Sequence, residues 1–201
     1  EREAEPGYLF RPAGGATDIG GDLAAGKAEQ PSYRTDRYPY LMAELGGGLE
    51  PTHHRRPIVS GDDTGALAMA ALGSGAALLG YYMYHGGTNP AGRFSTLQES
   101  KDSGGCNDVP ELSYDFQAPI GEYGQIRESY GQLKAIHLFL HDFGVEMAES
   151  ACFFPPDNPR SPEDTDHLRY SIRFGEKGGF LFLSNYQRRR KMTEKRDVTV
   201  R

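Results

Sequence analysis

Pro39-Tyr40-Leu41-Met42-Ala43-Glu44 is an apolar run without polar alternation, and Gly46-Gly47-Gly48 follows it almost at once. Such a run is typical of a strand buried on both faces, as in a parallel sheet. A helix rich in small residues is predicted to begin at Asp62, Asp63 or Thr64 and to end near residue 77. Residues 78–84 form the next apolar strand. The order strand, helix, strand predicts a parallel α/β layer.

A second helix and a β hairpin are predicted farther along the chain. Apolar residues recur at helical spacing over residues 124–140, and Gly144 is the predicted helix end. Residues 168–174 and 180–186 are rich in strong β-formers and flank a Gly-rich turn, which predicts a hairpin. We therefore divide the chain into residues 1–150, a linker over 151–166, and the start of a separate β domain over 167–201.

Composition excludes several classes of function. The 201 residues carry a net charge of −6, which argues against a dedicated nucleic-acid binder and against an anionic membrane as partner. Residues 64–84 are uncharged, but their Gly and Ala content favours a buried helix and strand over a membrane span. Cys106 and Cys152 lack metal-ligand spacing, and whether they form a disulfide is left open. We expect neither a metal site nor a cofactor.

Polar residues that follow the two apolar strands are the candidate functional residues. Glu44 closes the first strand, and active-site groups of parallel α/β folds lie at the carboxyl ends of strands. The alternative is a structural glutamate paired with Arg55 or Arg56. His85 and Asn89 follow the Tyr-rich second strand, and together with tyrosines they suit a polyhydroxylated ligand.

Three motifs in tandem identify a family resemblance. Tyr82-Met83-Tyr84-His85-Gly86-Gly87-Thr88-Asn89 is followed by Ser113-Tyr114-Asp115-Phe116-Gln117-Ala118-Pro119 with Glu122-Tyr123-Gly124, and then by Ser129-Tyr130-Gly131-Gln132-Leu133-Lys134. In order and spacing these motifs resemble glycoside hydrolase family 35, the retaining β-galactosidases. The resemblance covers roughly residues 38–144.

The resemblance implies the C-terminal part of a (β/α)₈ barrel, with residues 39–44 as its seventh strand and 78–84 as its eighth, followed by a β-sandwich domain. It implies that Glu44 is the catalytic nucleophile and that Tyr114 and Phe116 line the sugar site. Asn89 and His85 are expected there from their position after the second strand. The substrate would be a terminal β-galactoside or an oligosaccharide, cleaved through a glycosyl-enzyme intermediate.

The family's acid/base Glu follows an Asn, and this chain contains no Asn-Glu pair. A complete barrel takes about 250 residues, yet the predicted seventh strand begins at residue 39. We therefore expect a piece of a longer enzyme that is inactive alone.

The chain departs from the family pattern at two places. Phe116 replaces a tyrosine, and Leu45-Gly46-Gly47-Gly48-Leu49 replaces an aromatic-rich segment with a Trp. These departures keep two alternatives open: a retaining glycosidase of other sugar specificity, and a carbohydrate-binding relative without catalysis. The resemblance suggests an exported protein, while the compartment, the aglycone and the oligomeric state stay open.

Overall fold

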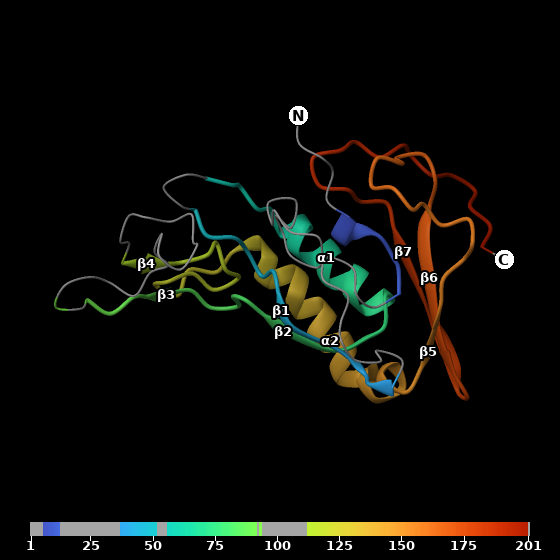
Figure 1. Ribbon diagram of the computed structural model, residues 1–201, viewed down its shortest axis with the longest axis horizontal. Coiled ribbons are helices and arrows are strands. Elements are labelled where there is room, and N and C mark those ends of the chain that lie inside the picture. The colour runs from blue at the N-terminus through green and yellow to red at the C-terminus, as the bar shows by residue number, and fades with distance from the viewer. Residues whose placement is uncertain (1–5, 13–36, 52–55, 92, 94–111, 201) are drawn as a thin grey trace.

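The computed structural model describes residues 6–12, 37–51, 56–91, 93 and 112–200 (Figure 1). The described residues have mixed α/β content in three small sheets, and no closed barrel is formed among them. The described residues form two α-helices and seven strands. A short 3₁₀ turn, η1 (Pro6–Tyr8), precedes them. In the described parts, no helix is long and apolar enough to cross a membrane.

The predicted strand, helix, strand unit is confirmed. It consists of β1 (Tyr40–Leu45), α1 (Gly61–Gly73) and β2 (Ala76–Tyr81), and β1 pairs in parallel with β2. The helix starts earlier than expected, because Ser60 is its N-cap. The Ser60 hydroxyl accepts the Asp63 N–H at 3.1 Å, and the Asp63 carboxylate accepts the Ser60 N–H at 2.8 Å. This capping box satisfies two N–H groups that would otherwise lack partners.

The two parallel strands are covered on one face only. Met42 and Leu45 are buried in the core that the helices supply, whereas Leu41 is 54 % and Leu78 is 48 % exposed. Of the two helices, α1 contacts both strands and α2 contacts β2. The expectation that these strands are buried on both faces is therefore wrong for the described residues, since nothing described there covers the second face.

The second helix, α2 (Glu128–Ala148), is longer and later than predicted. It runs through Gly144 instead of ending there, and Ile126 lies before it with an exposed side chain. Leu133, Ile136 and Met147 are its buried apolar residues and pack with α1 in the core. A glycine inside a helix lowers helix stability by about 1 kcal/mol relative to alanine. This cost does not end a helix whose other turns are well packed.

The predicted hairpin is confirmed as β6 (Arg169–Gly175) and β7 (Gly178–Ser184), joined by Glu176 and Lys177. A third strand, β5 (Ala151–Phe153), pairs with β6 and falls at the start of the segment expected to be a linker. Cys152 is half-buried on β5. Cys106 lies outside the described residues, so the disulfide between the two cysteines stays open.

Buried polar side chains join this sheet to the helices. The Arg173 guanidinium donates to the carbonyls of Leu72, Ala76 and Met147, and the Ser171 hydroxyl donates to the carbonyl of Gly73 at 2.8 Å. The C-terminal carbonyls of a helix carry partial negative charge, so a buried guanidinium is well matched to them. Arg173 thereby binds the ends of α1 and α2 to the β5–β6–β7 sheet.

Candidate functional site

Glu44 lies near the carboxyl end of β1 with an exposed side chain, and its neighbour Leu45 is fully buried in the core. The pairing of β1 with β2 is irregular between Met42 and Leu45, so that both of these side chains face the helices. Adjacent residues of a strand point to opposite faces. The Glu44 carboxylate is therefore directed to the face of β1 and β2 that the helices leave open.

The alternative for Glu44 was an ion pair. Arg56 is described, and no ion pair joins it to Glu44 within the described part of the chain. Arg55 lies outside the described residues.

Tyr82 shares the open face with Glu44. The Tyr82 N–H donates to the Leu45 carbonyl at 2.9 Å, which places the two strand ends side by side. Tyr81 packs into the core, where its hydroxyl lies 3.0 Å from Nε2 of His137 on α2. Tyr82, the next residue, points the opposite way and is 39 % exposed.

Three rings form an aromatic cluster on this side: Tyr82, Tyr114 and Phe116. Ring centroids are 6.3 Å apart for Tyr82 and Tyr114, 5.2 Å for Tyr82 and Phe116, and 4.8 Å for Tyr114 and Phe116. The hydroxyls of Tyr82 and Tyr114 are hydrogen-bonded at 2.6 Å. Of the predicted sugar-site residues, the structure thus brings Tyr114 and Phe116 together, and Tyr82 joins them.

The glycines after β1 allow neighbouring backbone to approach closely. A Cβ added at Gly47 would lie 2.1 Å from the Met83 carbonyl oxygen, and one at Gly48 would lie 2.1 Å from the Phe116 carbonyl oxygen. The segment after Glu44 therefore packs directly against the chain after β2 and against the aromatic cluster.

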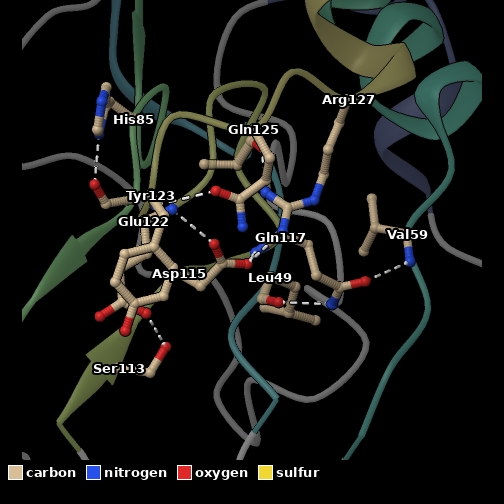
Figure 2. Close-up of polar contacts among 12 residues, drawn as sticks. Leu49, Val59, His85, Ser113, Asp115, Gln117, Glu122, Tyr123, Gln125 and Arg127 are labelled. Carbon is tan, nitrogen blue, oxygen red and sulfur yellow. Dashed lines mark hydrogen bonds and ion pairs between the residues drawn. The ribbon is translucent and has the colours of Figure 1, made fainter.

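Asp115 is a structural residue between two members of the cluster. Its carboxylate forms an ion pair with Arg127 at 2.7 Å and accepts the N–H groups of Gln117 at 3.2 Å and Glu122 at 2.8 Å (Figure 2). Three of the about four acceptor sites of this carboxylate are therefore used within the protein, which is typical of a structural role.

Gln117 holds the cluster to the loop that follows Glu44. Its side-chain amide donates to the carbonyls of Leu49 at 2.8 Å and Pro57 at 2.9 Å, and its oxygen accepts the Val59 N–H at 3.2 Å (Figure 2). Gln117 and Phe116 both adopt positive φ, of 51° and 57°. These bonds fix the turn that presents Phe116.

Two short strands carry the remaining motif residues: β3 (Gly87–Thr88) and β4 (Ser113–Tyr114), which pair antiparallel. The Ser113 hydroxyl donates to one oxygen of Glu122 at 2.7 Å, and the Thr88 hydroxyl donates to the other. These donors lower the pKa of the Glu122 carboxyl, with Ser113 the larger cause.

His85 and Asn89 are placed differently from each other. His85 is exposed, and its Nδ1 contacts the Gly86 carbonyl (Figure 2). Asn89 is 9 % exposed, and its N–H donates to the Leu112 carbonyl at 2.7 Å. Among the described residues, no ring contact or side-chain hydrogen bond joins His85 or Asn89 to the aromatic cluster.

Comparison with known proteins identifies the family. The family model "Glycosyl hydrolases family 35" matches residues 16–140, which is more than half of the chain. The chain belongs to glycosyl hydrolase family 35. A curated relative, Beta-galactosidase 10 of Arabidopsis thaliana, is 33 % identical over 110 residues. That match covers 54 % of this chain and 12 % of the relative.

Among the described residues, no group of three or more His, Cys, Asp or Glu side chains is arranged to hold a metal ion.

Sequence reasoning missed Tyr82 and Glu122 as site residues. The signal for Tyr82 was present, because a core position for Tyr81 places the next side chain on the opposite face. The role of Glu122 depends on two hydroxyls from strands that are distant in sequence, which no local pattern reveals.

Proposed function

We propose that this chain is the nucleophile-bearing part of a retaining β-galactosidase-like glycosidase, with Glu44 as nucleophile. One observation carries the proposal: the Tyr82 N–H donates to the carbonyl of Leu45, the residue after Glu44, so the chain position of Glu44 lies beside Tyr82, which belongs to the aromatic cluster. Family membership supplies the reaction class.

The Glu44 carboxylate attacks the anomeric carbon of the sugar, and the bond from that carbon to the leaving-group oxygen breaks as a second carboxyl group protonates the oxygen. Water then attacks the glycosyl-enzyme ester, gives up a proton to the same second group, and releases Glu44 as a carboxylate. Glu44 is exposed and forms no ion pair with the described residues, which suits this role because its charge is available for the sugar.

The aromatic cluster binds the sugar beside Glu44. Ring faces pack against the apolar C–H face of a pyranose, and the hydroxyls of Tyr82 and Tyr114 hydrogen-bond its hydroxyl groups. Phe116 offers a ring face without a hydroxyl. Asn89 and His85 are proposed to complete the site at its margin.

We infer that the acid/base carboxyl group comes from another part of a longer protein. Retention requires two carboxyl groups about 5–5.5 Å apart, and the chain contains no Asn-Glu pair that would match the family's acid/base. The chain matches only 12 % of the length of its curated relative. The exposed second face of β1 and β2 is consistent with strands that belong to a larger barrel, whose last part would be residues 1–150.

In this proposal residues 151–166 lead from the barrel into the β domain expected from residue 167 on, and β5 at their start already pairs with β6 of that domain. The chain alone is then expected to bind sugars weakly and to show no turnover.

The test is chemical rescue of Glu44→Ala in the full-length protein that contains this chain. Hydrolysis of an aryl β-galactoside should be lost, and added azide should restore turnover and give the α-galactosyl azide, because azide attacks from the side that the carboxylate has vacated. Glu176→Ala, on the exposed β6–β7 turn, is the matched control and should retain full activity.

Other outcomes discriminate the alternatives. Retained hydrolysis by Glu44→Ala would overturn the nucleophile assignment. Rescue with a different aryl glycoside but not with the galactoside would assign another sugar, and sugar binding without turnover by the unmutated full-length protein would favour a carbohydrate-binding relative.

A further inference from the structure

We propose that Glu122 is a positioning residue that holds β3 and β4 together and so places Tyr114 and Asn89 at the sugar site. The proposal rests on the proposed function for the meaning of that site. Among the described residues Glu122 forms no hydrogen bond with Glu44, and its proposed effect is exerted through the two short strands.

The Glu122 carboxylate bridges a cross-strand pair. Thr88 of β3 lies directly opposite Ser113 of β4 in the antiparallel register. The Thr88 hydroxyl donates to Oε1 of Glu122, and the Ser113 hydroxyl donates to Oε2 at 2.7 Å (Figure 2 shows the Ser113 bond). An isolated two-residue pairing has little stability of its own, so a charged acceptor shared by both strands contributes much of what holds them.

The residues that follow Thr88 and Ser113 in the sequence are predicted sugar-site residues. Tyr114 comes directly after Ser113, and Asn89 comes directly after Thr88. Because neighbouring side chains of a strand point to opposite faces, turning Ser113 toward Glu122 directs Tyr114 away from Glu122, toward Tyr82. The carboxylate thus selects the face on which the Tyr114 ring lies.

Glu122 is itself held rigidly by the protein. Its N–H donates to Oδ1 of Asp115 at 2.8 Å, and Asp115 forms the ion pair with Arg127 at 2.7 Å. Gly86 approaches so closely that an added Cβ would lie 2.9 Å from the Glu122 nitrogen. Tyr114 is therefore fixed on both sides, through Ser113 to the Glu122 carboxylate and through Asp115 to the Glu122 backbone.

A carboxylate is the group that fits this position. It accepts both hydroxyls at once, whereas the amide of a glutamine offers one acceptor oxygen and one donor group. Hydroxyls can reverse their direction to accept from that amide, so Glu122→Gln should retain part of the function. Glu122→Ala removes both bonds and leaves the strands without their common partner.

The first test measures the strand pairing without any activity. Amide hydrogen exchange of Asn89, whose N–H is bonded to the Leu112 carbonyl at 2.7 Å, should be at least 10-fold faster in Glu122→Ala than in the unmutated chain and intermediate in Glu122→Gln. Exposed Glu149→Ala, at the end of α2, is the control and should leave this exchange unchanged. Unchanged exchange in Glu122→Ala would overturn the proposal.

The second test measures the site in the full-length protein. For an aryl β-galactoside, Glu122→Ala should raise KM about 10-fold with a smaller effect on kcat, since sub-ångström misplacement of a binding ring weakens binding. Ser113→Ala and Thr88→Val should each give part of the loss, and neither should add to Glu122→Ala.

The outcomes separate the two proposals. An unchanged KM in Glu122→Ala, with activity abolished in Glu44→Ala, would overturn the positioning role and leave the proposed function intact. Full activity in Glu44→Ala would overturn the proposed function, while the exchange measurement would still decide whether Glu122 holds the two strands.

Discussion

The hydroxyl oxygens of Tyr82 and Tyr114 lie 2.6 Å apart, although the residues are 32 positions apart in the chain. The bond joins the end of β2 to β4 on the open face of the parallel strands. It brings the two tyrosine-containing motifs into one aromatic cluster beside the end of β1, where Glu44 lies. The proposed sugar site depends on this junction.

Removing the Tyr114 hydroxyl should lower kcat/KM and leave the aromatic cluster packed. Tyr114→Phe loses the bond to Tyr82 and one hydrogen-bonding group for the sugar, and the latter loss, worth about 0.5–1.5 kcal/mol, is the one that kcat/KM measures. In the full-length protein kcat/KM for an aryl β-galactoside should fall about 2–10-fold. Phe116→Tyr, which adds a hydroxyl to the same cluster, should not lower it. A Tyr114→Phe variant with unchanged kcat/KM would remove Tyr114 from the sugar site.

Gly47 should tolerate no side chain. Because an added Cβ would lie 2.1 Å from the Met83 carbonyl oxygen, Gly47→Ala must displace backbone and should destabilise the chain by about 1–3 kcal/mol. The matched control is Gly131→Ala, at an exposed helical glycine with nothing near the added atom, which should stabilise by about 0.5–1 kcal/mol. Urea unfolding followed by far-ultraviolet circular dichroism measures both, and equal midpoints for the two variants would contradict this packing.

Arg173 should be the most costly polar residue to replace. It is 1 % exposed and donates to carbonyls at the ends of both helices. Arg173→Met should lower the unfolding free energy by about 3 kcal/mol, because several buried acceptors lose a charged donor. The control is Arg196→Met, at an exposed arginine paired with Glu194 at 2.9 Å, for which we expect less than about 0.5 kcal/mol. A small effect at Arg173 would mean that the sheet is not held to the helices through this side chain.

Stability should rise with pH across the titration of His137. Burial lowers the pKa of His137, so between its folded pKa and the unfolded value of about 6.5 the unfolded chain binds more protons. The contribution is therefore complete above about pH 6.5 and is lost as the pH falls toward the folded pKa. Thermal melting between pH 5 and 7 should show this slope, and His137→Gln should flatten it. His141→Gln, an exposed position on the same helix, should keep the slope.

Local chemistry predicted the strand, helix, strand unit and the hairpin because each rests on a short pattern of apolar or β-forming residues. The start of α1 was missed because Ser60 competes with three other good N-cap residues. Only the reciprocal contact between Ser60 and Asp63 decides among them. The end of α2 was missed because Met147 packs in the core, so that the helix continues beyond Gly144. Propensity alone does not contain that information.

The motifs predicted Tyr114 and Phe116 as sugar-site residues, whereas the contact between their two rings is known only from the structure. Their arrangement depends on contacts across long sequence distances, such as Gln117 with Leu49 and Glu122 with Thr88. The tight approach of Gly48 to the Phe116 carbonyl was likewise hidden in the sequence. Glycines at a strand end are equally compatible with a ligand and with a crossing backbone.

The most direct test of the nucleophile assignment is trapping of the glycosyl-enzyme. A 2,4-dinitrophenyl 2-deoxy-2-fluoro-β-galactoside carries a leaving group that needs no protonation, while its fluorine slows hydrolysis of the ester, so the intermediate accumulates. The full-length protein should be inactivated with a single galactosyl label, and peptide mass spectrometry should place it on Glu44. A label on any other carboxylate, or inactivation that persists in Glu44→Gln, would contradict the account.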